Sequence, residues 1–321
     1  MKLVYLDVHT ATQKADFPAC VLALGYFDGI HRGHRTVIET AMNEAQQRDV
    51  QTAVMTFYPH PKEVLGRPES PMRYLTPLEA KVTQFERLGV DVVYAVHFTR
   101  ALSQLSCQQF VDQFIVELNA SHVVAGFDFT YGAKGQGTMQ HMPAYAQGRF
   151  TQTTVEKVSD VGEKISSTRI REALDQGDVA TAATLLGTPY EVAGTVIHGD
   201  ARGRQIGFPT ANVSLKQRYH LPKNGVYVVQ LDVKGATHQG MANIGVRPTF
   251  KADEAEPTLE VHLFDFTSDI YDEQVTVRFY ERIRSERVFN GVDELKAQLA
   301  QDEVEARAYF KSRSDNMKNT F

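Results

Sequence analysis

Short apolar runs alternate with helical patterns from residue 19 to about residue 186, and this alternation limits the folds open to the chain most strongly. Residues 33–48 predict a helix, because apolar side chains recur there at helical spacing. Four runs predict buried strands: ACVLALG (19–25), TAVMTF (52–57), VDVVYAVHF (90–98) and SHVVAG (121–126). Strands that alternate with helices are typical of βαβ units, so we expect a doubly wound parallel sheet, a Rossmann-like α/β domain.

Two helix starts carry capping signals. Thr76, Pro77 and Glu79 predict a capping box with proline at the first helical position. Ser106 and Gln109 predict a second box, ahead of a helix that buries Phe110, Phe114 and Leu118.

The hydrophobic period changes at residues 187–189. The segments 225–233, 258–266 and 275–280 alternate with a period of two, which predicts a small antiparallel β-barrel. Leu295, Leu299 and Tyr309 mark a C-terminal helix that closes it. Because 321 residues suffice for two cores, we expect domains at 1–186 and 187–321.

Composition excludes some partners. A net charge of −5 disfavours wholesale binding to nucleic acid or to an anionic membrane, so a phosphate ligand must be held locally. Two cysteines make no disulfide framework, and no run has the roughly 18 apolar residues of a spanning helix. We expect a soluble cytoplasmic protein.

The motif GYFDGIHRGH (25–34) follows the first predicted strand and begins the first helix. A helix N-terminus attracts phosphate, and Gly25, Gly29 and Gly33 let a ligand approach the backbone closely. His31 and His34, one turn apart, would point at one anion. The alternatives are metal ligation, which needs further ligands, and ordinary core histidines.

A second motif, ISSTRIREAL (165–174), places hydroxyl and guanidinium donors just before an apolar helix. Alone it could be a capped, solvated helix start. Together the two motifs resemble the nucleotidyltransferases that carry HxGH and SSTxxR motifs, which attack the α-phosphate of ATP. That resemblance implies that the triphosphate is held by His31, His34, Ser167, Thr168 and Arg171. The chain has no GxxxxGK[ST] phosphate loop that would compete for ATP.

The stretch GTVIHGDARGRQIGFPTANV (194–213) is rich in glycine and polar residues. Its glycines and arginines could wrap a phosphate chain, and Thr210 and Asn212 offer oxygen ligands suited to Mg²⁺. A long barrel loop is the alternative. Glu260 alternates with Leu259, Val261 and Leu263, so it faces away from one apolar layer. It is either a positioned carboxylate or part of a solvated exterior.

Over essentially the whole chain, the sequence resembles the bacterial bifunctional riboflavin kinase/FMN adenylyltransferase (FAD synthetase) family. The matching elements occur in the family order: GYFDGIHRGH, TFYPHP (56–61), GFDFTYG (126–132), ISSTRIR, GRQIGFPTAN (203–212), LPKNGVYVV (221–229), ANIGVRPTF (242–250) and LEVHLFDF (259–266). Tyr26 stands where many relatives have Asn, and Lys134 where several carry arginine.

The resemblance implies two reactions, with riboflavin, FMN and ATP as substrates and Mg²⁺ as cofactor. The barrel would phosphorylate riboflavin with Glu260 as the base and with Thr210 and Asn212 at the metal, and the first domain would adenylylate FMN. It also implies residues that contact nucleotide or flavin: Gly25, Phe27, Asp28, Gly29, Phe57, Asp128, Phe129, Tyr131, Gly199, Arg204, Gly207, Phe208, Pro209, Asn243 and Arg247.

Three questions stay open at this level. Phe57, Phe129 and Tyr131 are candidates for a flavin slot, with simple packing as the alternative. One half could be inactive, or the chain could be a regulatory module that binds flavin or nucleotide without turnover. We expect a monomer or a weak homo-oligomer.

Overall fold

A computed structural model of the chain describes residues 1–9, 16–66, 72–199, 202–246 and 257–318. The chain forms two compact units, Met1–Ser167 and Thr168–Phe321. The expected domain boundary between residues 186 and 187 stays a prediction.

Six strands form the main sheet of the N-terminal unit, and all its strand pairs are parallel, in the order β1-β4-β3-β2-β5-β8. The strands are β1 (Lys2–Leu6), β2 (Cys20–Leu24), β3 (Gln51–Tyr58), β4 (Val92–His97), β5 (Ala120–Gly126) and β8 (Thr151–Val155). The expected doubly wound sheet and its four apolar strands are confirmed. Strands β1 and β8 were not predicted; they lie at the two edges of the sheet, and the sequence of β8, TQTTV, is mostly polar.

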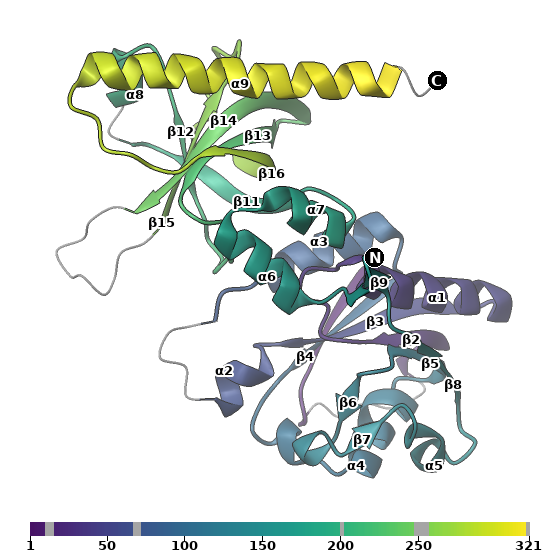
Figure 1. The fold of residues 1–321 in the computed structure, drawn as a ribbon. Coiled ribbons are helices and arrows are strands. Elements are labelled where there is room, and N and C mark those ends of the chain that lie inside the picture. Colours follow the sequence, from purple (N-terminus) through teal and green to yellow (C-terminus); the bar gives the residue numbers. More distant parts are fainter. Residues whose placement is uncertain (10–15, 67–71, 200–201, 247–256, 319–321) are drawn as a thin grey trace. The chain divides into compact units, whose positions relative to one another are not determined.

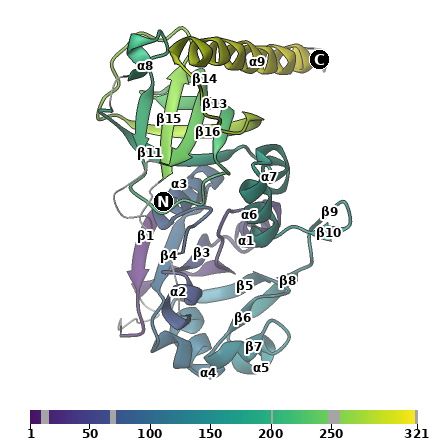
Figure 2. The same ribbon diagram turned by 60° about the vertical axis from the view of Figure 1, so that its left-hand side comes forward.

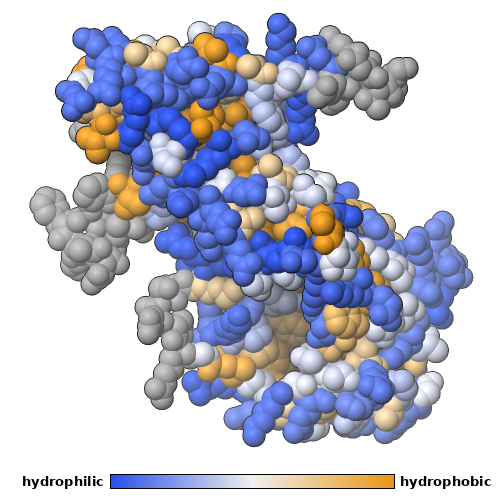
Figure 3. Space-filling view, viewed as in Figure 1, coloured by the Kyte–Doolittle hydropathy of each residue, from blue (hydrophilic) through white to orange (hydrophobic). Residues whose placement is uncertain are grey.

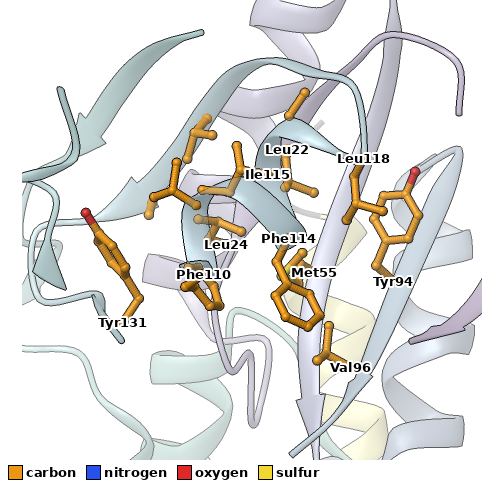
Figure 4. Packing of buried hydrophobic residues seen from close by; sticks show 14 of the residues in the cluster. Leu22, Leu24, Met55, Tyr94, Val96, Phe110, Phe114, Ile115, Leu118 and Tyr131 are labelled. Carbon is orange, nitrogen blue, oxygen red and sulfur yellow. The ribbon is translucent and has the colours of Figure 1, made fainter. Parts of the chain in front are cut away.

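Helices cover both faces of this sheet (Figure 1). On one face pack α1 (Arg32–Arg48) and α3 (Leu78–Leu88), whose apolar side chains meet Val21, Val54 and Val93. On the other face pack α4 (Cys107–Val111), the π-helical turn η3 (Asp112–Val116) and α5 (Met142–Ala146). Figure 4 shows this second cluster, with Phe110 and Phe114 against Met55 and Leu24. The shorter elements are α2 (Pro61–Leu65), η2 (Leu102–Gln104), η4 (Ala133–Gly135) and the strand pairs β6 (Thr130–Tyr131) with β7 (Gly137–Thr138) and β9 (Ser159–Asp160) with β10 (Glu163–Lys164).

One capping prediction is confirmed and the other is wrong. Ser106 and Gln109 form the expected reciprocal capping box. Helix α3 instead has Pro77 at its N-cap, without a side-chain cap. The backbone N–H of Thr76 donates to the buried carboxylate of Asp28, so a tertiary contact holds the segment in place of the local box.

The C-terminal unit is the expected antiparallel barrel, closed in the order β11-β12-β15-β14-β13-β16 (Figure 2). Its strands are β11 (Tyr190–Ile197), β12 (Ala211–Ser214), β13 (Gly225–Val233), β14 (Ala236–Val246), β15 (Pro257–Leu263) and β16 (Gln274–Arg284). Its helices are α6 (Ser167–Gln176), α7 (Val179–Leu186), α8 (Arg202–Gln205) and α9 (Val292–Lys318).

Helix α9 covers part of the outer barrel wall (Figure 2). Ala306 and Phe310 are buried against Val226 and Val228, while Leu299 and Tyr309 pack at the margin. The three residues expected on the apolar face of this helix are all only half-buried: Leu295, Leu299 and Tyr309. The buried Asp302 accepts from Arg284 Nη2 at 2.7 Å and from its Nε at 2.9 Å, which ties α9 to the end of β16.

Candidate active sites

The first candidate site lies where the order of the parallel strands reverses. From β2 the chain passes through α1 to β3 on one side, while β5 pairs with β2 on the other side. The carboxyl ends of two such strands open a crevice that suits ligands. The loop 25–31 leaves β2 there, and residues 127–131 leave β5. Figure 3 shows a recess with apolar residues at its floor in the lower body, which is the N-terminal unit.

The loop 25–31 is held in an unusual backbone conformation. Phe27, Gly29 and Ile30 have positive φ angles of 55°, 94° and 42°. Such a conformation persists only where the surroundings impose it. Here Phe27 and Ile30 are buried, and the Asp28 carboxylate accepts the N–H of Thr76 at 2.9 Å. The loop is therefore a rigid platform at the start of α1.

His31 caps α1 and stacks on His34. His31 Nδ1 accepts the backbone N–H of His34 at 3.2 Å, so any ring proton of the neutral imidazole lies on Nε2. The ring centroids of the two histidines lie 3.6 Å apart, and Phe27 packs edge-on against His34. Burial lowers the pKa of His31 to about 4 and, with help from His31 and Lys81, holds the pKa of His34 well below its usual value. Both rings are neutral donors at pH 7.

This geometry does not suit a shared metal ion. The rings are nearly parallel, so their in-plane lone pairs cannot converge on one ion. The described residues also contain no group of three His, Cys, Asp or Glu side chains that could hold a metal. His34 Nδ1 is buried and has no hydrogen-bond partner among the described residues.

The two N-terminal motifs meet at one hydrogen bond. Ser167 Oγ donates to the backbone carbonyl of Asp28 at 2.8 Å, which places the start of the SST segment against the histidine loop. Thr168 and Arg171 follow on α6 and belong to the C-terminal unit. Lys164 forms an ion pair with Asp128 and lies 4.9 Å from the centroid of the Phe127 ring. Its charge also lowers the pKa of both histidines. Lys164 was not predicted, although it lies just before the SST motif.

A buried lysine on α3 supports the loop 25–31. Lys81 on α3 donates from Nζ to the Tyr26 carbonyl at 2.7 Å and to Thr56 Oγ1 at 3.3 Å. Its ammonium also lies 4.1 Å from the centre of the Tyr26 ring, and only 2% of the residue is exposed. Lys81 was not predicted either, because a lysine on a helix is ordinarily expected at the surface.

The aromatic candidates divide by exposure. Phe57 and Tyr131 belong to the buried cluster around Phe110, whereas Phe129 is half-buried. Phe127, which was not predicted, keeps 43% of its surface exposed. Phe129 and Phe127 are thus the rings of the β5 loop that a planar ligand can reach.

The second candidate site is a row of polar side chains across three barrel strands. Glu260 on β15 lies directly opposite Asn212 on β12 and Asn243 on β14. Directly opposed residues share a sheet face. Leu259 and Val261 are buried on the inner face, so Glu260 lies on the outer face, as its alternation predicted. Thr210 Oγ1 donates to Glu260 Oε2 at 3.5 Å, the long limit of a hydrogen bond.

The glycine-rich segment packs against this row. A side chain at Gly199 would come within 2.1 Å of Asn212 Nδ2, so only glycine allows this approach. Gly207 has φ near 89°, Arg204 and Pro209 are exposed and Phe208 is half-buried. Arg247 lies outside the described residues. A hydroxyl, an amide and a carboxylate therefore adjoin one another, a donor set that fits Mg²⁺.

The fold and the two sites define a two-domain enzyme class that handles nucleotide phosphates: an α/β nucleotidyltransferase-like domain followed by a kinase-type barrel. Residues 13–169 match the family model described as FAD synthetase, and residues 186–310 match the one described as riboflavin kinase. The Bacillus subtilis bifunctional riboflavin kinase/FMN adenylyltransferase is 49% identical over 97% of this chain and 98% of its own. The Escherichia coli protein of the same name is 39% identical over 97% and 98%. The chain therefore belongs to the bifunctional riboflavin kinase/FMN adenylyltransferase family.

A solved structure supports the shared fold. The crystal structure described as a macrolide-efflux protein from Streptococcus pneumoniae superposes with a TM-score of 0.86, at 36% identity over 96% of this chain and 99% of that one. None of the helices in the described part of the present chain has the length and apolar character needed to cross a membrane.

Proposed function

We propose that the barrel phosphorylates riboflavin to FMN and that the N-terminal domain adenylylates FMN to FAD, each with ATP. The observation that carries the proposal is a chemical difference between the two sites. One is centred on a carboxylate, Glu260, and the other on neutral donors, His31 and His34. This difference matches the needs of two different nucleophiles.

In the barrel, the nucleophile is a hydroxyl group. Glu260 would accept the proton of the ribityl 5′-hydroxyl as its oxygen attacks the γ-phosphate of ATP and ADP leaves. Asn212 and Asn243, on either side of Glu260, would orient the substrate or hold its polar groups. Thr210 and Asn212 would hold Mg²⁺, which neutralises phosphate charge when bound.

In the N-terminal domain, the nucleophile is the FMN phosphate, which is already ionised at pH 7, so no base is required. Its oxygen attacks the α-phosphate of ATP, and pyrophosphate leaves. His31 Nε2–H, an N–H of His34 and the Ser167 hydroxyl would donate to the phosphate oxygens. The family resemblance implies the same role for Thr168 and Arg171. Phe27 would act by supporting the His34 ring, since it is itself buried.

We place the adenylylation in residues 1–186 and the phosphorylation in residues 187–321, and we place the protein in the cytoplasm. Both cysteines are free and buried, as suits a reducing compartment.

The test is chromatography of the flavins formed from riboflavin, ATP and Mg²⁺. Wild type should yield FMN and FAD, and a chelator should stop FMN formation. Glu260→Gln should abolish FMN formation but still convert supplied FMN to FAD. The double variant His31→Ala, His34→Ala should instead accumulate FMN. Equal loss of both steps in either variant would refute the division of labour, and flavin binding without turnover in wild type would favour the regulatory module.

A further inference from the structure

We propose that His262 is a positioning residue of the barrel site, which holds the Pro209 carbonyl and so keeps Thr210 beside Glu260. The inference rests on the proposed riboflavin kinase function. His262 lies two residues beyond Glu260 on β15, and therefore on the same face of the strand.

The contact has a defined direction. His262 Nδ1 lies 2.8 Å from the Pro209 carbonyl oxygen. A carbonyl oxygen can only accept, so Nδ1 carries the proton and donates. The ring is held edge-on by Phe208 at 5.3 Å and by Phe264 at 6.0 Å, and the Phe264 ring is in turn covered by Arg307. The imidazole is therefore fixed before any ligand binds.

The hydrogen bond from His262 to Pro209 lies just beyond the last residue pair between β12 and β15. The pairing of β12 with β15 comprises Ala211 opposite Val261 and Asn212 opposite Glu260. Residues 209 and 210 lie beyond this pairing, and Pro209 has no N–H with which to extend it. The side chain of His262 replaces the missing backbone contact at this position.

Thr210 depends on this contact. Its own hydrogen bond to Glu260 is long, at 3.5 Å, and cannot fix the segment alone. Without the His262 contact, Pro209 and Thr210 lose the hydrogen bond that holds them beside β15, although the N–H of Phe208 still donates to the Gly203 carbonyl at 2.9 Å. The hydroxyl of Thr210 would then be displaced from the carboxylate of Glu260 and from Asn212, with which it would hold Mg²⁺.

Two substitutions at His262 separate the effect of its hydrogen bond from the effect of its ring. In His262→Asn, the amide Nδ2 takes the place of the imidazole Nδ1 and can still donate to Pro209. His262→Phe keeps the ring but loses the donor. His238→Phe is the matched control, since His238 is half-buried on β14 against Phe266 and lies five residues from Asn243.

We expect His262→Phe to lower kcat/KM for riboflavin phosphorylation about tenfold, the factor that one ordinary hydrogen bond produces, and to raise the Mg²⁺ concentration for half-maximal rate. His262→Asn should lie within about twofold of wild type on both measures, because it restores that bond. Conversion of supplied FMN to FAD should be unchanged in both variants and in His238→Phe.

A His262→Phe variant with wild-type kinase kinetics would overturn the inference. So would equal kinase losses in His262→Asn and His262→Phe, because the donor would then be irrelevant. If the proposed riboflavin kinase function were wrong, the wild-type protein itself would form no FMN.

Discussion

The imidazole rings of His31 and His34 stack with their centroids 3.6 Å apart and their planes 14° from parallel. Two positive rings at this separation would repel each other, and burial disfavours each charge further. The pair therefore works as uncharged donors, and its chemistry does not depend on proton uptake near pH 7.

This pairing predicts how stability depends on pH. The pKa of His31 is about 4 in the folded chain, against about 6.5 for an exposed histidine. Below pH 6.5 the unfolded chain takes up a proton that the folded chain refuses, so stability falls until pH 4. At about 1.4 kcal/mol per pKa unit, this loss is about 3 kcal/mol.

His31→Asn tests that loss, because asparagine also caps a helix but does not titrate. Calorimetric unfolding of the full chain between pH 7 and pH 4 should show a pH dependence shallower by about 3 kcal/mol in the variant. An unaltered pH dependence would show that His31 is not the group responsible.

Lys81→Met should impair adenylylation alone. The variant removes the ammonium that holds the Tyr26 carbonyl and leaves that oxygen with Thr56 only. Because Lys81 also lowers the pKa of His34, the acid limb of the FMN-to-FAD rate should move to higher pH. We expect the rate at pH 7.5 to fall at least tenfold, the cost of about one charged hydrogen bond. Riboflavin phosphorylation should be unaffected, and the exposed Lys62→Met should match wild type in both steps. Equal loss of both activities would point to general misfolding instead.

Gly25→Ala should disturb the histidine site through packing. The new methyl group would lie 2.7–2.9 Å from three ring carbons of Phe27, whose ring is buried and supports His34. Overpacking of this kind costs about 1–3 kcal/mol, and FAD formation should fall with it. Gly291→Ala, which has no neighbour within 4 Å, is the control. Thermal unfolding and FMN-to-FAD rates measure both effects, and a Gly25→Ala protein as stable and active as wild type would contradict the packing argument.

Arg284→Met should loosen α9. The fully buried Asp302 would lose its guanidinium partner and keep only Gln298 beside it, at a cost of about 3–5 kcal/mol. In the double variant Arg284→Met, Asp302→Leu, no buried charge remains, so much of that loss should be recovered. Urea unfolding followed by circular dichroism compares the two. If the double variant is the less stable, the cost lies in the lost packing of the arginine stem.

Sequence periodicity predicted the elements that carry a full apolar face. Strand β13 begins and ends where its alternation does, and α1 buries the four side chains that its spacing marks: Val37, Ile38, Ala41 and Ala45. Strand β8 was missed because its sequence, TQTTV, contains only one apolar residue, and β1 was missed although KLVYL is largely apolar. The Thr76 box failed because local capping competes with tertiary contacts, and Asp28, distant in sequence, bound the same N–H.

The site residues follow a similar rule. His31, Ser167 and Glu260 could be named as candidates from the sequence because they stand in motifs that are compact in sequence. Lys81 and His262 act on backbone carbonyls of residues far along the chain, Tyr26 and Pro209. A contact of that kind leaves no local pattern, so the fold is needed to reveal it.

The barrel closes through one short strand. Strand β12 meets β15 through two residue pairs, one of which is Asn212 with Glu260, and meets β11 through three, whereas β13 and β14 are joined along nine. Local opening of the barrel should begin at β12, so the amides of β12 should exchange with solvent sooner than those of β13. A ligand that contacts both Asn212 and Glu260 would hold β12 to β15, so substrate binding should slow hydrogen exchange in the barrel.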